Sequence, residues 1–156
     1  MSVRALILDP ADQVLLVRFD WEALDLAGGF WANPGGGIEV GETRLDALRR
    51  ELREEIGMEI GALGPEVWTK TARFDMADWD GQVDHIHLVR TEHFDPQPAL
   101  SAAELAAENL HEIRWWPPAQ ELREGCANFA PRALPALLAR LRDEGIPTTP
   151  IKVEGF

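Results

Sequence analysis

Cysteine, tyrosine and long apolar runs are scarce or absent in this chain. Its one cysteine, Cys126, excludes an internal disulfide and favours a reducing compartment, so a cytoplasmic protein is expected. No stretch approaches the ~20 apolar residues that cross a bilayer, and no membrane partner is expected. Residues 1–17 lack the basic leader, long apolar core and small-residue cleavage site of a secretion signal, and their pattern is typical of a strand. We therefore expect no secretion signal.

Positive charge is also scarce, since 15 Lys and Arg residues stand against 27 Asp and Glu residues, for a net charge of −12. This balance argues against a nucleic-acid polymer or an anionic membrane as partner, because both bind clustered cations. A phosphate ester would be repelled by such a chain unless divalent cations reversed the local sign. An acidic protein that acts on phosphate esters therefore needs those cations.

The length of 156 residues suits one domain with one core. We expect this domain to span residues 1–145, in a monomer or a homodimer. Residues 146–156 are rich in proline and glycine, and we expect them to form a loosely held tail.

Apolar runs separated by turn residues predict most of the elements. Two such runs, at residues 3–8 and 14–17, lie across a five-residue turn and predict a hairpin. Further strands are expected at 67–74, 83–89 and 113–116, with turns at 75–81 and 95–99. Helical turns are expected at 101–109 and 119–123, and a longer amphipathic helix at 132–144, with Leu134, Leu137, Leu138 and Leu141 on one stripe. Trp31 leads into the glycine-rich residues 33–37, which are expected to be a loop without helix or strand. This order predicts a mixed sheet covered by helices.

A helix is predicted between Thr43 and Gly57. Thr43 and Asp46 have the spacing of a capping box, and Gly57 suits a C-terminal cap. Its apolar residues recur at helical spacing and are Leu45, Leu48, Leu52 and Ile56. The helix therefore has one face to bury.

Three acids, Glu51, Glu54 and Glu55, share the neighbouring face of this helix at about 100° per residue. Like charges at this spacing repel one another unless a cation lies among them. Carboxylate oxygens are ligands that suit Mg²⁺ or Mn²⁺. Arg50 is four residues before Glu54 and can pair with it, and the glycines at 35–37 let the backbone approach a ligand closely.

The segment from Gly36 to Met58 resembles the signature box of the MutT-like Nudix hydrolases, with the pattern Gly36-x5-Glu42-x7-Arg50-Glu51-Leu52-x-Glu54-Glu55-x-Gly57-Met58. A chance match is on the order of one in 10⁸. The one departure is Met58, where the family usually has Ile, Leu or Val. The resemblance continues in Trp31-x-x-Pro34-Gly35-Gly36, in Arg114-Trp115-Trp116 and in Glu121-Leu122. It implies an α/β fold of the Nudix type, an α/β/α sandwich with a mixed central sheet.

The resemblance also implies roles for individual residues. The implied metal ligands are the carboxylates of Glu51, Glu54 and Glu55 and the backbone carbonyl of Gly35. Arg50, with Glu42, is expected to hold these acids in place. A further carboxylate is expected from a later loop, where Glu108 is our choice and Glu104 and Glu112 are its rivals. Glu51 or Glu108 would act as general base.

Candidates for substrate contact flank the glycine loop. They are Arg18, which could meet a phosphate or lie on the surface, and the aromatic residues Phe19, Trp21, Phe30 and Trp31, which could stack on a base or pack in the core. His85 and His87 face one side of a strand. Such a pair could bind a metal or contact substrate, but histidines with this spacing more often lie at the surface or in a cleft.

The function implied is Mg²⁺-dependent hydrolysis of a pyrophosphate bond in a nucleoside di- or triphosphate derivative. A pyrophosphatase of ADP-ribose or nucleotide sugars and a non-catalytic nucleotide sensor are the alternatives. Hydrolysis at an RNA end is disfavoured by the net charge of −12 and the lack of a basic patch.

Overall fold

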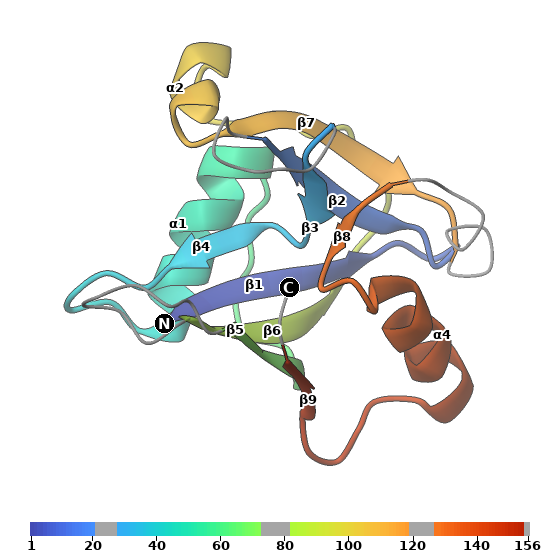
Figure 1. Ribbon diagram of the computed structural model, residues 1–156. Coiled ribbons are helices and arrows are strands. Elements are labelled where there is room, and N and C mark those ends of the chain that lie inside the picture. The colour runs from blue at the N-terminus through green and yellow to red at the C-terminus, as the bar shows by residue number, and fades with distance from the viewer. Residues whose placement is uncertain (21–27, 73–81, 119–126, 155–156) are drawn as a thin grey trace.

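The computed structural model describes residues 1–20, 28–72, 82–118 and 127–154, which form a curled mixed sheet with helices on both faces (Figure 1). The strands are β1 Ser2–Leu8, β2 Val14–Phe19, β3 Phe30–Ala32, β4 Gly35–Gly37, β5 Glu66–Ala72, β6 Gln82–Arg90, β7 Leu110–Trp116, β8 Phe129–Ala130 and β9 Ile151–Glu154. The helices are α1 Arg44–Ile56, α2 Ala102–Ala107 and α4 Leu134–Glu144.

The sheet is organised around β1. Its strand order is β8-β3-β2-β1-β6-β5-β9, with β4 joined to β1 and β7 to β2. β1 runs parallel to β6 and antiparallel to β2 and β4, so the sheet is mixed as the fold class requires. The predicted hairpin is confirmed, with Leu8 opposite Val14. The first residues of β1 pair instead with the glycines of β4, which places the glycine run beside the start of the central strand.

Strand alternation in β1 divides the core into two layers. Val3, Ala5 and Ile7 pack on the α1 side, together with Leu48 and Leu52 of that helix. Leu6 and Leu8 face the other side, where the leucine stripe of α4 covers the sheet. The candidate acids belong to α1, so they lie on the first of these faces.

Local signals fix both ends of α1 as predicted. The Thr43 hydroxyl accepts from the Asp46 amide at 3.1 Å, and the Asp46 carboxylate accepts from the Thr43 amide at 3.1 Å. Gly57 ends the helix with a φ of 70°, a left-handed conformation that costs glycine little. Strands β5 and β6 and the short helix α2 also agree with their predicted positions, whereas β7 begins at Leu110, three residues before the predicted strand, so that Glu112 lies in a strand and not in a loop.

Three expectations need correction. The loop expected at 33–37 is confirmed only for Asn33 and Pro34, because Gly35–Gly37 form β4, which β1 holds by backbone pairing. Within the expected tail, Ile151–Glu154 are not loosely held, since this strand, β9, pairs in parallel with β5. The helix expected from residue 132 begins at Leu134, with Pro135 in its first turn.

Several expectations fall outside the described residues. They concern the turn at 75–81, the helical turn at 119–123 with Glu121 and Leu122, the aromatic Trp21, and Cys126. Among the described residues, no helix is long and apolar enough to cross a membrane.

Candidate functional site

Helix α1 places two of the three candidate acids on its buried side. Glu55 is 2% exposed and Glu51 is 9% exposed, and both lie one turn from leucines that pack against β1. Glu54 points farther out, with a side chain 29% exposed. The expectation that three acids share one face is therefore confirmed for Glu51 and Glu55 only. These two are four residues apart and lie on the buried face of α1 with its leucines.

Glu55 is held by the glycine strand. Its Oε2 accepts a hydrogen bond of 3.0 Å from the Gly35 amide. Burial, reinforced by the neighbouring charge of Glu51, raises the pKa of Glu55 to about 8, although Arg4 and the Gly35 amide oppose this rise. A carboxylate buried with so little compensation needs a proton or a cation.

Glu51 lies between an arginine and a glycine. Its Oε1 accepts from Arg50 Nη1 at 2.8 Å. On its other side Gly36 is so close that a Cβ there would lie 2.6 Å from the same oxygen. Burial raises the pKa of Glu51, with Arg50 acting against it and the charges of Glu54 and Glu108 adding to it. Only glycine at position 36 leaves room for this carboxylate.

Arg50 connects the acids to the loop before α1. Its Nε and Nη2 donate to the two carboxylate oxygens of Glu42 at 2.9 and 2.8 Å, and Nη2 also donates to the Gly37 carbonyl at 3.0 Å. These bonds lower the pKa of Glu42 to about 2. The predicted partner Glu54 is farther away, at 3.7 Å from Nη1. Arg50 thus orients Glu51 more directly than it orients Glu54.

Glu108 completes an acidic group from outside the helix. It follows α2 and is exposed, yet one of its carboxylate oxygens lies within 4.8 Å of oxygens of Glu51 and Glu55. The rivals Glu104 and Glu112 have other partners: Glu104 accepts from the Ser101 amide at 3.1 Å, and Glu112 accepts from Arg114 at 2.6 Å. Of the three acids weighed for this loop, Glu108 is the one in the cluster.

The donor set of this cluster fits a divalent metal. Three carboxylates converge, and two of them are buried. Among the described cations, Arg50 bonds to one oxygen of Glu51, and Arg4 acts on Glu55 only through its charge. Hard oxygen ligands with room for water and phosphate are the usual environment of Mg²⁺. The Gly35 carbonyl, also expected as a ligand, lies 3.5 Å from Arg4 Nη1.

The candidate substrate residues occupy different environments. Trp31 is 6% exposed and meets Trp116 edge to face at 5.0 Å, and Phe30 is 8% exposed and contacts Phe19 at 5.7 Å. Both pack in the core, which is one of the two roles that the sequence left open; the other was stacking on a base. Arg18 has a side chain 24% exposed and lies 3.5 Å from Asp20 and 3.8 Å from Glu112.

The paired histidines of β6 have structural partners. His85 Nδ1 lies 2.6 Å from Glu66, and the His85 ring also meets Arg44. His87 is buried, with Nδ1 2.7 Å from the Gly64 carbonyl. Sequence reasoning missed Arg4, whose guanidinium contacts the glycine turn. The available signal was that Arg4 is the only charged residue in the apolar run 3–8.

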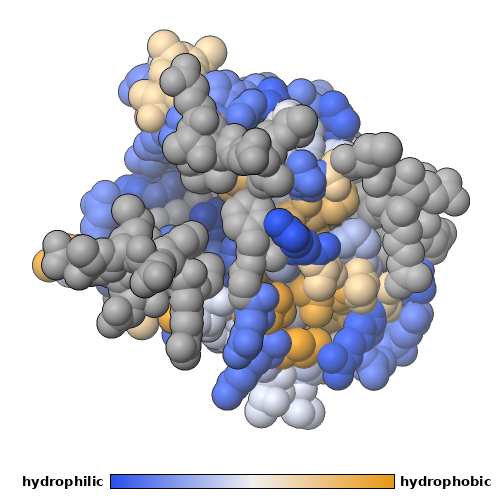
Figure 2. Space-filling view, viewed as in Figure 1, coloured by the Kyte–Doolittle hydropathy of each residue, from blue (hydrophilic) through white to orange (hydrophobic). Residues whose placement is uncertain are grey.

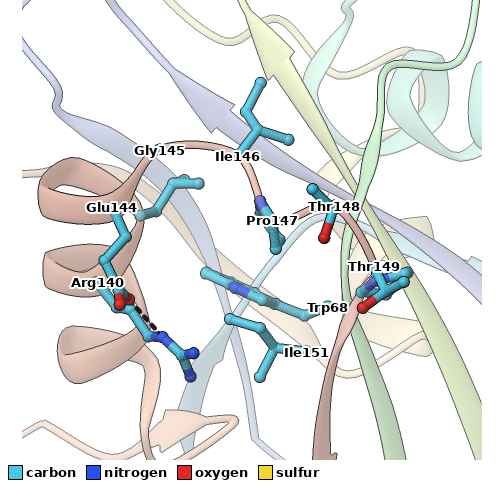
Figure 3. Close-up of a pocket in the computed structure, with 11 residues that line it drawn as sticks. Trp68, Arg140, Glu144, Gly145, Ile146, Pro147, Thr148, Thr149 and Ile151 are labelled. Atoms are coloured by element: carbon cyan, nitrogen blue, oxygen red, sulfur yellow. Dashed lines mark hydrogen bonds and ion pairs between the residues drawn. The ribbon is translucent and has the colours of Figure 1, made fainter.

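A cavity of about 500 Å³ lies away from the acids, between the end of α4 and the strands β5 and β9 (Figure 3). Trp68 and Ile151 line it beside the paired side chains of Arg140 and Glu144. Apolar surface gathers between α4 and β9 in the space-filling view, whereas most of the remaining described surface in that view is hydrophilic (Figure 2). The cavity therefore belongs to the far face of the sheet and not to the acidic cluster.

Comparison with known proteins gives one family match and several relatives. The family model for the NUDIX domain matches residues 1–137. The chain is 38% identical over 100 residues to the RNA pyrophosphohydrolase of Helicobacter pylori strain ATCC 700392 / 26695, over 59% of this chain and 63% of that protein. It is 43% identical over 63 residues to the nucleoside triphosphatase NudI of Enterobacter sp. strain 638, over 39% of this chain and 44% of that protein. The chain thus spans less than two thirds of either relative.

Solved structures show the same fold over most of the chain. The MutT protein of Methanosarcina mazei Go1 has a TM-score of 0.64 at 22% identity and covers 92% of each chain. The NUDIX domain of Shewanella oneidensis NrtR, a cocrystal with ADP ribose, has a TM-score of 0.61 at 20% identity and covers 92% of this chain and 86% of its own.

Proposed function

The chain belongs to the NUDIX family, and we propose that it is a Mg²⁺-dependent hydrolase of a pyrophosphate bond in a nucleoside di- or triphosphate derivative. The observation that carries the proposal is the group of carboxylates from Glu51, Glu55 and Glu108, whose oxygens lie within 4.8 Å of one another. The relatives named as a pyrophosphohydrolase and as a nucleoside triphosphatase support this class of reaction. Mn²⁺ prefers similar ligands and could replace Mg²⁺.

The roles of the residues follow from their positions. Glu51, Glu55 and Glu108 would hold the metal, with Glu54 and the Gly35 carbonyl as further candidate ligands. A divalent cation bound there supplies a counter-charge for the phosphate chain and acidifies a bound water. Arg50 keeps the Glu51 carboxylate in one orientation through its bond of 2.8 Å, and its own position is fixed by Glu42.

The proton of the attacking water needs an acceptor. Glu51 and Glu108 are the two candidates, as both belong to the cluster. Arg18, partly exposed on β2, is the candidate for contact with a substrate phosphate.

A small nucleotide is favoured as substrate over a polymer. The net charge of −12 opposes binding of an extended polyanion. The relative named RNA pyrophosphohydrolase makes a 5′-phosphorylated RNA end the second candidate. ADP-ribose or a nucleotide sugar, and nucleotide sensing without turnover, are the remaining alternatives, the former supported by the ADP-ribose cocrystal of a structural neighbour.

The test measures phosphate or pyrophosphate release from a panel with Mg²⁺. The panel holds nucleoside triphosphates, ADP-ribose, a nucleotide sugar and a 5′-triphosphorylated RNA, each with wild type, Glu55→Gln from the cluster, Glu54→Gln and the control Glu59→Gln. Glu59 has an exposed side chain paired with Arg53 at 2.8 Å. We expect turnover to fall by about 100-fold in Glu55→Gln and in Glu54→Gln, the usual loss when one charge-stabilising group is removed, and to persist in the control. Equal turnover of wild type and Glu55→Gln would refute the site, equal turnover of wild type and Glu54→Gln would remove Glu54 from the ligands, and no turnover on any substrate would favour the sensor.

A further inference from the structure

One charged side chain of the central strand contacts the turn that precedes β4, next to the candidate active site. Arg4 alternates with the residues of β1 that face α1, and its side chain is only 17% exposed. Its Nη1 donates to the Asn33 carbonyl at 2.9 Å and lies 3.5 Å from the Gly35 carbonyl oxygen. Arg4 therefore holds both sides of the turn that leads into β4.

Three successive carbonyls of this turn are held by two successive residues of β1. Between the two contacts of Arg4, the Pro34 carbonyl accepts from the Ala5 amide at 2.8 Å. Gly35 lies directly on Arg4, since a Cβ there would come within 2.6 Å of the Arg4 Cα. With its carbonyls fixed in this way, the turn presents the Gly35 N–H to the Glu55 carboxylate at 3.0 Å.

A buried carboxylate in turn holds Arg4. Asp84 of β6 is 3% exposed, and its Oδ2 lies 3.6 Å from Arg4 Nε and 3.3 Å from Lys70 Nζ. The hydroxyl of Ser2 donates to the other oxygen of Asp84. Burial alone would raise the pKa of Asp84, but Arg4 and Lys70 together hold it below its ordinary value. Asp84 therefore stays ionised and anchors the guanidinium at a fixed place on the sheet.

We propose that Arg4 is a positioning residue of the active site, anchored by Asp84, which fixes the Asn33–Gly35 turn so that the Gly35 N–H orients Glu55. This inference rests on the proposed function only for the assignment of Glu55 to the site. Arg4 acts through the backbone and through Glu55, with no contact to substrate. An arginine suits this role better than a lysine, because its Nη1 meets the two carbonyls while its Nε keeps the ion pair with Asp84, and a lysine has only one nitrogen.

The test compares the full chain with Arg4→Lys, which keeps the charge and loses the fork. We expect kcat to fall by about 100-fold, because a displacement of a catalytic group by about 1 Å, here Glu55, has an effect of this size. KM should be nearly unchanged. The Gly35 amide should exchange faster with deuterium in Arg4→Lys. Arg90→Lys is the control, because its side chain on β6 is 62% exposed and pairs only loosely with Asp12, at 3.7 Å.

Amide exchange separates this inference from the proposed function. Faster exchange at Gly35 in Arg4→Lys supports the positioning role even where no substrate is turned over, and unchanged exchange overturns it even where turnover is found. A rise in KM with kcat intact would also overturn it, because that result assigns Arg4 to substrate binding. Should Arg4→Lys fail to fold, Asp84→Asn removes the charge that anchors Arg4 and must accelerate exchange at Gly35, or the inference fails.

Discussion

Replacing Gly36 by alanine puts one methyl group against the candidate metal site. The new Cβ would lie 2.6 Å from Glu51 Oε1, 2.7 Å from its Cδ and 3.0 Å from its Oε2, whereas ordinary contact begins at 3.4 Å, so the carboxylate must move by about 0.8 Å. The backbone at position 36 has no left-handed conformation that would oppose alanine. The strain therefore falls on the end of the Glu51 side chain.

The expected loss is large in activity and small in stability. A displacement near 1 Å of a catalytic group costs about 100-fold in rate, equal to about 2.7 kcal/mol in activation free energy. Overpacking costs about 1–3 kcal/mol of folding stability when the core cannot yield. Here the displaced group is the end of a flexible side chain, and restriction of the unfolded chain returns about 0.4–1 kcal/mol. The melting temperature should thus change little.

The assay is kcat/KM on the best substrate of the panel with Mg²⁺, together with calorimetric titration of Mg²⁺ and a melting curve. Gly37→Ala is the matched control, because a Cβ at Gly37 meets no atom within 4 Å. Gly36→Ala should lose activity and metal affinity while Gly37→Ala keeps both. Equal activity in the two variants would refute the claim that Gly36 makes room for a working Glu51, and equal loss would point to the backbone of the whole glycine run.

Two further changes address the charge and the core. Because the pKa of Glu55 is raised to about 8, the folded chain binds its proton more tightly than the unfolded chain, and metal-free stability should fall as pH rises from about 4.5 through 8. In EDTA at pH 8, urea unfolding should therefore show Glu55→Gln to be more stable than wild type by on the order of 4 kcal/mol. The variant should gain no stability when Mg²⁺ is added. A variant less stable than wild type would contradict the burial argument. Leu52→Ala removes a side chain that is 0% exposed, and should cost about 2–5 kcal/mol at any pH, an expectation that a shift below 1 kcal/mol would exclude.

Elements that carry their own signals could be predicted from the sequence. Helix α1 has a cap, an apolar period and a terminal glycine within its own residues, and all three predictions agree with the structure. Strand β4 has no such signal, because its glycines become a strand only by pairing with Ser2 to Arg4, more than thirty residues away. The same holds for β9, whose four residues follow two prolines and gain their conformation from β5.

The candidate site shows the same division. The acids on α1 could be placed from spacing alone, whereas the choice among the later acids depends on how α2 and its following turn are packed. Glu104 could have been excluded as a candidate from the sequence alone, because Ser101 and Glu104 have the spacing of a capping box, in which the Glu104 carboxylate is already engaged. Arg4 could not be assigned, since its acceptors are carbonyls about thirty residues away that only the fold brings near.

Strand β9 bears on where the chain can be shortened for expression or crystallisation. The family match ends at residue 137, inside α4, but apolar contacts continue through Leu138 and Leu141 to Ile151 and Val153, which pack against the layer that contains Trp68. A fragment trimmed at the family boundary would bare that indole and an open edge of β5, and such edges invite aggregation. A soluble minimal fragment should accordingly retain the chain as far as Glu154.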